Sequence, residues 1–358
     1  MKHLFRFIFV PLCLLILMAN AFATIRYVDS IGGENHFNTI NEAYSAAVDG
    51  DTLLISEGIY AEDLESSKQL VIIGNGIDPG YQTRINGWIK LHSGSSGTII
   101  EGVYVYESGT NTLVIDAAVS GVAIRRSWIT TYNYSAILSN SLHDLEITDC
   151  IVSVQASNSA RACLQLNGTA VEITNSLLYH HTANTAYAVR DQPESLILTN
   201  CIVLNFRTFA NLSGAFPMLI SNTIFCDWYN GTANWGSYPA GSTWEYNAST
   251  SSLPPGTNSI YLTLDPFVNY DEGDNYVPGT SDLHLDPVNG VPCIDTGSPA
   301  ILDLDGSVSD LGLYGGLTPF IDTGAPNFPF VSGLVLPGAI TVGDPLPIQS
   351  TGRIGREY

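Results

Sequence analysis

The feature of this sequence that most limits its fold is an internal repeat of eight positions. Its columns read apolar, variable, Ile or Leu, mostly polar, mostly Asn or Asp, small, apolar, apolar. Five copies align without gaps: Val122–Ile129, Leu145–Val152, Val171–Leu178, Leu196–Val203 and Met218–Phe225. Two looser copies carry Gly in the fifth column, so that this column falls at positions 74, 102, 126, 149, 175, 200 and 222, with steps of 22 to 28 residues. Such a regular period indicates stacked structural units.

Each period has room for two or three short strands and for no helix. A weaker apolar run recurs between the main copies, as in Leu113–Asp116, Ala136–Ser139, Cys163–Leu166 and Tyr187–Arg190. Only 13% of residues are charged, and Gly, Asn, Ser and Thr are abundant, which disfavours helices. A β-propeller blade needs about 40 residues or more, and a leucine-rich repeat needs a helical segment. We therefore predict an all-β, single-stranded parallel β-helix whose turns stack about 4.8 Å apart.

The fifth column is predicted to form a ladder of side chains along the solenoid. Asn175, Asn200 and Asn222 lie one turn apart, where stacked amides could hydrogen-bond along the axis. Arg126 and Asp149 interrupt this pattern on adjacent turns and could form an ion pair.

The segment before the repeat is expected to cap the solenoid. Ile40, Ala43, Tyr44 and Ala47 have helical spacing, and Asp49-Gly50-Asp51 ends that helix before a strand at 52–55. Phe37–Glu62 as a whole resembles the N-terminal cap of secreted bacterial right-handed parallel β-helix proteins of the pectin-lyase-like superfamily. A helix in that position would cover an edge that otherwise invites aggregation.

The C-terminal part carries a second resemblance to these proteins. The segments Asp282–Leu285, Gly297–Ile301, Asp303–Gly306 and Asp310–Gly316 resemble the series that ends the coil in many bacterial surface β-helix proteins. The resemblance covers roughly residues 24–316 and implies a right-handed parallel β-helix with a short N-terminal capping helix. We expect the cap and first coil at 24–65, the β-helix with its closing segment at 66–316, and a Pro-rich linker with an incomplete β tail at 317–358.

The first 23 residues are predicted to be a secretory signal peptide. Lys2, His3 and Arg6 precede a 12-residue apolar stretch, and small residues at 19–23 offer a cleavage site. We expect a secreted or cell-surface protein, with no membrane span after signal cleavage. The formal net charge of -21 argues against nucleic acid as a partner, because phosphate binding needs a basic surface. The product is expected to be a monomer.

The cysteines do not suggest a disulfide framework. Five remain after signal cleavage, at irregular spacing and mostly in apolar runs: Cys150, Cys163, Cys201, Cys226 and Cys293. We expect them to be buried, small apolar side chains.

Two functions from different classes remain open. The first is a glycan-binding or adhesive protein, and the second is a divergent carbohydrate-active enzyme, such as a polysaccharide lyase, glycoside hydrolase or epimerase. The Trp-Ile-Asp-His series of pectate lyases, the Asn-Thr-Asp series of polygalacturonases and the Gly-Arg-Pro-Trp series of pectin esterases are all missing. The best acid and base candidates are His180, His181, Arg190 and Asp191.

A binding function draws on aromatic residues that follow the apolar pair of successive repeats. If they share one external face, they form a strip with one aromatic side chain per turn, on which sugar rings could stack. The predicted strip consists of Tyr106, Tyr132, Tyr179, Phe206 and Trp228. The expected partner is a polysaccharide or surface glycan.

An acidic segment near the C-terminus suggests a cation. Asp303, Asp305 and Asp310 lie within eight residues around a turn-forming Gly, in a region without Lys or Arg, and carboxylate oxygens suit Ca²⁺. The spacing excludes an EF-hand, and the alternative is that these side chains cap turns of the backbone.

Overall fold

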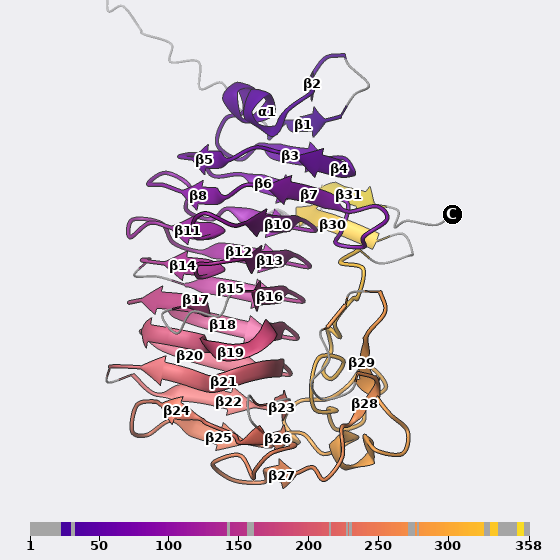
Figure 1. Ribbon diagram of the computed structural model, residues 1–358. Helices are drawn as coiled ribbons and strands as arrows, with labels where there is room; N and C mark the ends of the chain where they lie inside the picture. Colours follow the sequence, from indigo (N-terminus) through magenta and orange to yellow (C-terminus); the bar gives the residue numbers. More distant parts are fainter. Residues whose placement is uncertain are drawn as a thin grey trace, which may run out of the picture.

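The chain forms a three-sided solenoid of short parallel strands (Figure 1). The structure is a computed structural model. It describes residues 23–29, 33–141, 144–155, 161–214, 216–226, 228, 231–270, 276–277, 279–325, 330–335 and 349–353. All but one residue of the predicted signal peptide therefore lies outside the described residues. Among the described residues, no helix has the length and apolar character needed to cross a membrane.

The first side of the solenoid, side 1, is an 11-stranded sheet. Strands from consecutive turns pair in parallel along it, and β1 and β2 extend it at the N-terminal end. Its members are β1 (Ile25–Val28), β2 (His36–Phe37), β3 (Thr52–Ile55), β6 (Val71–Ile73), β9 (Ile99–Glu101), β12 (Val122–Arg125), β15 (Leu145–Thr148), β18 (Ala170–Thr174), β20 (Ser195–Thr199), β22 (Met218–Ser221) and β25 (Thr243–Glu245).

Side 2 follows side 1 along the chain in each turn, and it belongs to a 16-stranded sheet. Its members are β4 (Gly58–Tyr60), β7 (Thr83–Asn86), β10 (Tyr104–Glu107), β13 (Trp128–Thr131), β16 (Ile151–Val154), the first parts of β19 (Leu177–Gln192) and β21 (Ile202–Leu212), then β23 (Ile224–Cys226), β26 (Ala248–Ser249) and β27 (Ile260–Tyr261).

Side 3 completes each turn within the same sheet. Because β19 and β21 are long, they continue from side 2 into side 3 without a break. The other strands of side 3 are β5 (Leu64–Ser66), β8 (Ile89–Leu91), β11 (Leu113–Ile115), β14 (Ile137–Ser139), β17 (Ala162–Asn167) and β24 (Gly236–Ser237). The predicted all-β parallel β-helix is confirmed by this strand order.

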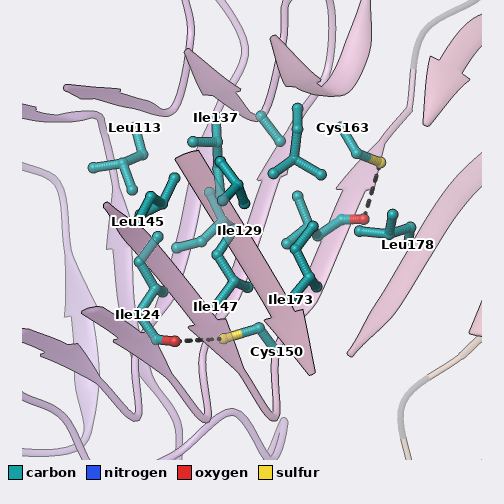
Figure 2. Close-up of a cluster of buried hydrophobic side chains, with 14 of the residues drawn as sticks. Leu113, Ile124, Ile129, Ile137, Leu145, Ile147, Cys150, Cys163, Ile173 and Leu178 are labelled. Atoms are coloured by element: carbon teal, nitrogen blue, oxygen red, sulfur yellow. Dashed lines mark hydrogen bonds between the residues drawn. The ribbon is translucent and has the colours of Figure 1, made fainter. Parts of the chain in front are cut away.

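Apolar side chains of equivalent positions stack to fill the interior. On side 1, Ile147 pairs in register with Ile124 on one neighbouring strand and with Ile173 on the other, and all three are fully buried. Figure 2 shows these residues packed against others from sides 2 and 3. Because inward and outward positions alternate along a strand, each inward column becomes a continuous apolar ladder.

The cysteines are buried apolar side chains, as predicted: Cys150, Cys163 and Cys201 lie in this interior, and Cys226 and Cys293 lie in a second apolar cluster. The five in the described residues are free and buried. Cys150 donates to the Ile124 carbonyl at 3.4 Å and Cys163 to the Val152 carbonyl at 3.0 Å (Figure 2), and Cys201 donates to the Ile173 carbonyl at 3.6 Å.

The predicted capping helix is α1 (Ile40–Ala46). The Thr39 hydroxyl accepts a hydrogen bond from the Glu42 backbone N–H, which satisfies one free donor of the first turn. Ile40, Ala43 and Ala47 are buried against the first turns of the solenoid. The helix thus covers the N-terminal end of the interior (Figure 1).

The fifth column of the repeat occupies the corner between sides 1 and 2. From Gly102 onward its residues have left-handed backbone conformations, with φ of 65° at Gly102, 54° at Asp149 and 52° at Asn200. Gly and Asn tolerate this conformation better than other residues, which explains why they recur in the column. Arg126 adopts the same conformation and pairs with the Glu101 carboxylate, so the ion pair expected with Asp149 is replaced by one with Glu101.

The resemblance leads us to expect that the C-terminal segment ends the coil. In the structure this segment does more than that. After β27, the described residues 262–270, 276–277 and 279–325, together named here the return segment, run back beside the solenoid (Figure 1). This segment contains β28 (Phe267–Asn269), β29 (Asp282–Leu285) and the 3₁₀ helix η2 (Val291–Cys293). Gly312 donates to the Asn222 carbonyl at 2.8 Å, and Ile77, several turns nearer the N-terminus, donates to Thr323 at 2.8 Å.

The predicted tail differs from expectation at its start. Residues 317–325 still belong to the return segment, and Phe320 is buried in its apolar cluster. Beyond it, β30 (Phe330–Val335) pairs antiparallel with β31 (Gln349–Arg353). The strand expected at 339–341 lies outside the described residues.

Candidate functional site: a groove on side 1

The return segment covers much of one side of the solenoid. The outward row of side 2 is apolar and buried at Ile151, Leu177, Ile202 and Ile224. These residues share a cluster with Leu311, Leu313 and Phe320 of the return segment. A ligand therefore has access mainly to sides 1 and 3.

Side 1 carries a groove of about 410 Å³ on its outer surface, named here the side-1 groove. It crosses strands β15, β18 and β20, and Asp144, the residue just before β15, also lines it. Inward residues of these strands are buried, and the alternating outward residues line the groove. The outward lining consists of Asp144, Glu146, Thr148, Ala170, Glu172, Thr174, Ser195 and Ile197. The short Ala170 and Ser195 side chains leave room between the longer side chains around them.

Two glutamates lie on adjacent strands in the lining of this groove. Glu146 and Glu172 are register partners on β15 and β18. Glu146 is held on both oxygens, by an ion pair with Arg125 at 3.1 Å and by the Thr148 hydroxyl at 3.3 Å. For the exposed Glu172 carboxylate, no hydrogen bond or ion pair is found among the described residues. Like charges placed directly opposite repel each other, so the groove favours a ligand that donates hydrogen bonds or carries positive charge.

A row of hydroxyls runs along side 1 next to the carboxylates. The Thr148 and Thr174 hydroxyls are 3.2 Å apart, and those of Thr199 and Ser221 are 3.3 Å apart. Since the strands of these residues follow one another in the sheet, the row extends over four turns. The partly exposed Thr148, Thr174 and Thr199 offer one hydroxyl per turn to a ligand lying along the axis, whereas Ser221 is buried.

The predicted acid and base residues are not brought together. His180 points inward, is fully buried and packs edge-on against Phe206. His181 lies on the outside, 3.3 Å from the Ser153 hydroxyl, and burial lowers its pKa to about 4. Arg190 and Asp191 pair with each other at 2.9 Å. Because His180 lies in the interior and His181 lies on the outside, the four residues do not form one acid–base site.

The prediction that five aromatic residues form an external strip is also wrong, because three of them are buried. Tyr179, Phe206 and Trp228 are only 0%, 1% and 4% exposed, respectively. Phe206 lies in the interior core, whereas the hydroxyl of Tyr179 accepts a hydrogen bond from the backbone N–H of Tyr276 in the return segment, at 2.7 Å. Trp228 packs edge-on against Trp235 near the last turns. Tyr106 is partly buried, and Tyr132, 48% exposed, is the one freely accessible ring of the five.

The acidic cluster in the structure differs from the predicted cation ligands by one residue, because Asp295 takes the place of Asp305. Carboxylate oxygens of Asp295, Asp303 and Asp310 lie within 4.8 Å of one another. Asp305 is outside this group, because its carboxylate accepts from the backbone N–H and hydroxyl of Ser307, at 2.9 and 2.6 Å. Asp303 accepts from the backbone N–H of Asp310 and of Gly316, as a turn cap does. A calcium ion would therefore find oxygen ligands here, and its binding stays a prediction.

The groove residues were missed at the level of sequence. Glu146 and Glu172 occupy the variable second column of the repeat, and Thr148, Thr174 and Thr199 occupy the polar fourth column. In a strand whose first and third positions are buried, these two columns must point outward. A carboxylate recurring in an outward column of adjacent turns was the available signal.

Side 3 has a polar network that was also missed. His92 contacts Asp116 through Nδ1 at 2.8 Å and Glu65 through Nε2 at 3.1 Å. The three residues come from three consecutive turns. This network joins the turns near the cap.

The comparisons with known proteins give similarity in structure alone. No family model and no curated protein matches the sequence. The chain is similar to a pectin methylesterase from Aspergillus niger, with 12% identity, a TM-score of 0.45 and coverage of 63% of this chain and 83% of that one. It is also similar to pectate lyase Pel9A, with 12% identity, a TM-score of 0.42 and coverage of 82% and 96%, and to the pectin methylesterase PemA from Erwinia chrysanthemi, with 10% identity, a TM-score of 0.35 and coverage of 63% and 92%.

Proposed function

We propose that this chain is an exported or cell-surface protein that binds a polysaccharide in the side-1 groove. The observation that carries the proposal is the groove itself, which lies on an outer side that the return segment does not cover. The predicted signal peptide at 1–23 supports export.

A polysaccharide suits the groove because the polar residues that line it recur from turn to turn along the solenoid. Neighbouring turns are about 4.8 Å apart, which is close to the length of one sugar residue. Each turn presents a hydroxyl or carboxylate oxygen that can accept a hydrogen bond from a sugar hydroxyl. Glu146, Glu172 and Asp144 would repel a polyuronate, so the expected ligand is uncharged or carries amino groups.

Catalysis by the same groove is the second candidate, and the placement of Glu146 opposite Glu172 favours it. Retaining glycoside hydrolases use two carboxyl groups about 5 to 5.5 Å apart, a separation that residues on adjacent strands can reach. Glu146, held by Arg125, would act as the nucleophile, and Glu172 as the acid. A lyase is favoured less, since it needs a cation to neutralise a uronate.

The test uses the mature protein against a panel of soluble and insoluble polysaccharides. Depletion from solution measures binding, and new reducing ends or 4,5-unsaturated products measure hydrolysis or elimination. The double variant with Glu146→Gln and Glu172→Gln should lose retention, whereas Glu57→Gln, a change of the same kind at an exposed position near the cap, should keep it. Retention that survives the double variant would contradict the groove as the binding site. Product formation that depends on Glu172 would establish the enzyme.

A further inference from the structure

The corner column fastens the return segment to the solenoid through its amides. Asn175 donates through Nδ2 to the carbonyls of Leu313 and Gly315, at 2.8 and 2.7 Å. Asn200 donates to the Ser309 hydroxyl at 2.9 Å, and Asn222 accepts from the Ser298 backbone N–H at 2.8 Å. At two successive turns, then, the side chain in this column acts as a hydrogen-bond donor to the return segment.

Asp149 occupies the next position of the same column but cannot donate when it is ionised. It has the same left-handed conformation, with φ of 54°, and it is only 6% exposed. Its Oδ1 atom is buried and has no hydrogen-bond partner among the described residues. A buried polar atom without a partner costs free energy in the docked state.

The return segment continues past this position. It contacts the column at Asn175 through Gly315, and nearer the N-terminus Gly324 lies close to the Arg126 carbonyl. The stretch between these contacts, residues 316–323, therefore passes over the turn of Asp149, and Phe320 within it is buried.

The charged groups around Asp149 do not replace the missing bond. Arg126, on the adjacent turn, is the cation whose field acts on Asp149, and it also pairs with the Glu101 carboxylate. The neighbouring Cys150 thiol stays neutral, because burial raises its pKa to about 12. On the return segment, Asp303 caps the Gly316 N–H, and Asp322 accepts from the Tyr314 hydroxyl.

We propose that Asp149 is a proton-dependent latch for the return segment. With a proton, its carboxyl group can donate a hydrogen bond as the asparagines of the column do, and the segment docks fully. Without the proton, a buried carboxylate faces the covering chain, and residues 316–323 open locally.

The direction of the pH dependence follows from the burial. Desolvation raises the pKa of Asp149 to about 7, with Arg126 acting in the opposite direction. In the opened state the carboxyl group regains its ordinary pKa near 3.8. The latch therefore stabilises the docked state fully below about pH 4, and this stabilisation is lost as the pH rises through about 7. Between pH 5 and pH 8 the opening equilibrium constant should increase by up to about a hundredfold.

Hydrogen exchange of the full-length mature protein tests the latch at the amides of Phe320 and Gly324, which bond to Leu313 and Ile321. Exchange rates are corrected for their intrinsic pH dependence and compared at pH 5 and pH 8. We expect increased opening at pH 8 in the wild type and equal opening at both pH values in Asp149→Asn. The exposed Asp144→Asn should behave like the wild type.

A reciprocal variant checks that the column position is responsible. Asn175→Asp replaces the amide that donates to Leu313 and Gly315 with a carboxylate. It should add pH-dependent opening of the return segment around Leu313 and Gly315. The response that depends on Asp149 should remain. Equal exchange of the wild type and Asp149→Asn at pH 8 would overturn the proposal. So would a pH-dependent difference confined to the solenoid strands, because the return segment would then not be the part that responds.

Discussion

Asn222 donates its side-chain amide to Oδ1 of Asn200 on the preceding turn, at 3.1 Å. Both residues are buried, and both have φ of 52°. This pair is the axial amide contact that the sequence predicts for the column, whereas the amide of Asn175 is directed to the return segment. The same residue type thus serves both stacking of turns and attachment of the covering chain.

Replacing Asn200 should separate its two contributions. Asn200→Gly removes the side-chain bonds but tolerates the left-handed backbone, and Asn200→Ala removes the bonds and also strains the backbone. We expect a loss of about 1 to 3 kcal/mol in the free energy of unfolding for Gly and a larger loss for Ala. Urea denaturation checks this order. Asn258→Gly, at an exposed position with φ of 54°, is the control and should change little.

The buried aromatic residues should matter for stability. Phe206→Ala leaves a cavity in the interior and should cost about 3 to 5 kcal/mol. Tyr132→Ala, at an exposed position, should stay within about 0.5 kcal/mol of the wild type. Thermal denaturation followed by circular dichroism measures both. Equal melting temperatures for the two variants would contradict the interior position of Phe206.

The cysteines should be unreactive in the native protein. Burial raises the pKa of Cys150, Cys201 and Cys293 to about 12, so their thiolate population at pH 8 is very small. We expect no alkylation by iodoacetamide within an hour under native conditions and alkylation of all five thiols in urea. Mass spectrometry counts the modified sites. Rapid labelling of a native thiol would show that its surroundings open easily.

Asp303 should be the most important of the acidic residues near the C-terminus. Its carboxylate accepts from two backbone N–H groups, so Asp303→Asn should destabilise the protein by about 1 to 3 kcal/mol. Asp305→Asn should have a smaller effect, because that side chain is exposed.

Calcium provides a further comparison at the same place. If Asp295, Asp303 and Asp310 bind the ion, millimolar Ca²⁺ should raise the melting temperature of the wild type above that in NaCl of equal ionic strength, and Asp303→Asn should abolish the rise. Superimposed melting curves in Ca²⁺ and EDTA would leave the turn-capping role alone.

The fold was predictable because its determinant is local and repeated. Columns such as Ile124, Ile147 and Ile173 recur at the spacing of one turn, and stacking puts them in register. The capping helix was predictable from Thr39 to Ala47 for the same reason, since its signals are close in sequence.

The surfaces were harder to predict, because what covers them comes from distant parts of the chain. Tyr179 points away from the interior, but Tyr276, 97 residues later, covers it. No period links the return segment to the turns on which it lies. The groove depends on which outward positions carry small side chains, such as Ala170, and that becomes visible when three strands are placed side by side.

The return segment also bears on the order in which the molecule can fold. Asn175 and Gly315 are 140 residues apart in sequence, so their contact must wait until the chain between them has been synthesised and the intervening turns have formed. Until then, the apolar row of Ile151, Leu177, Ile202 and Ile224 is open to solvent. Contacts of such long separation form slowly. A nascent chain emerging from the ribosome therefore passes through a period in which its solenoid is formed but exposes apolar surface that favours aggregation. Synthesis and docking of the return segment end that period, so a segment that follows the solenoid in the chain protects the apolar row formed before it.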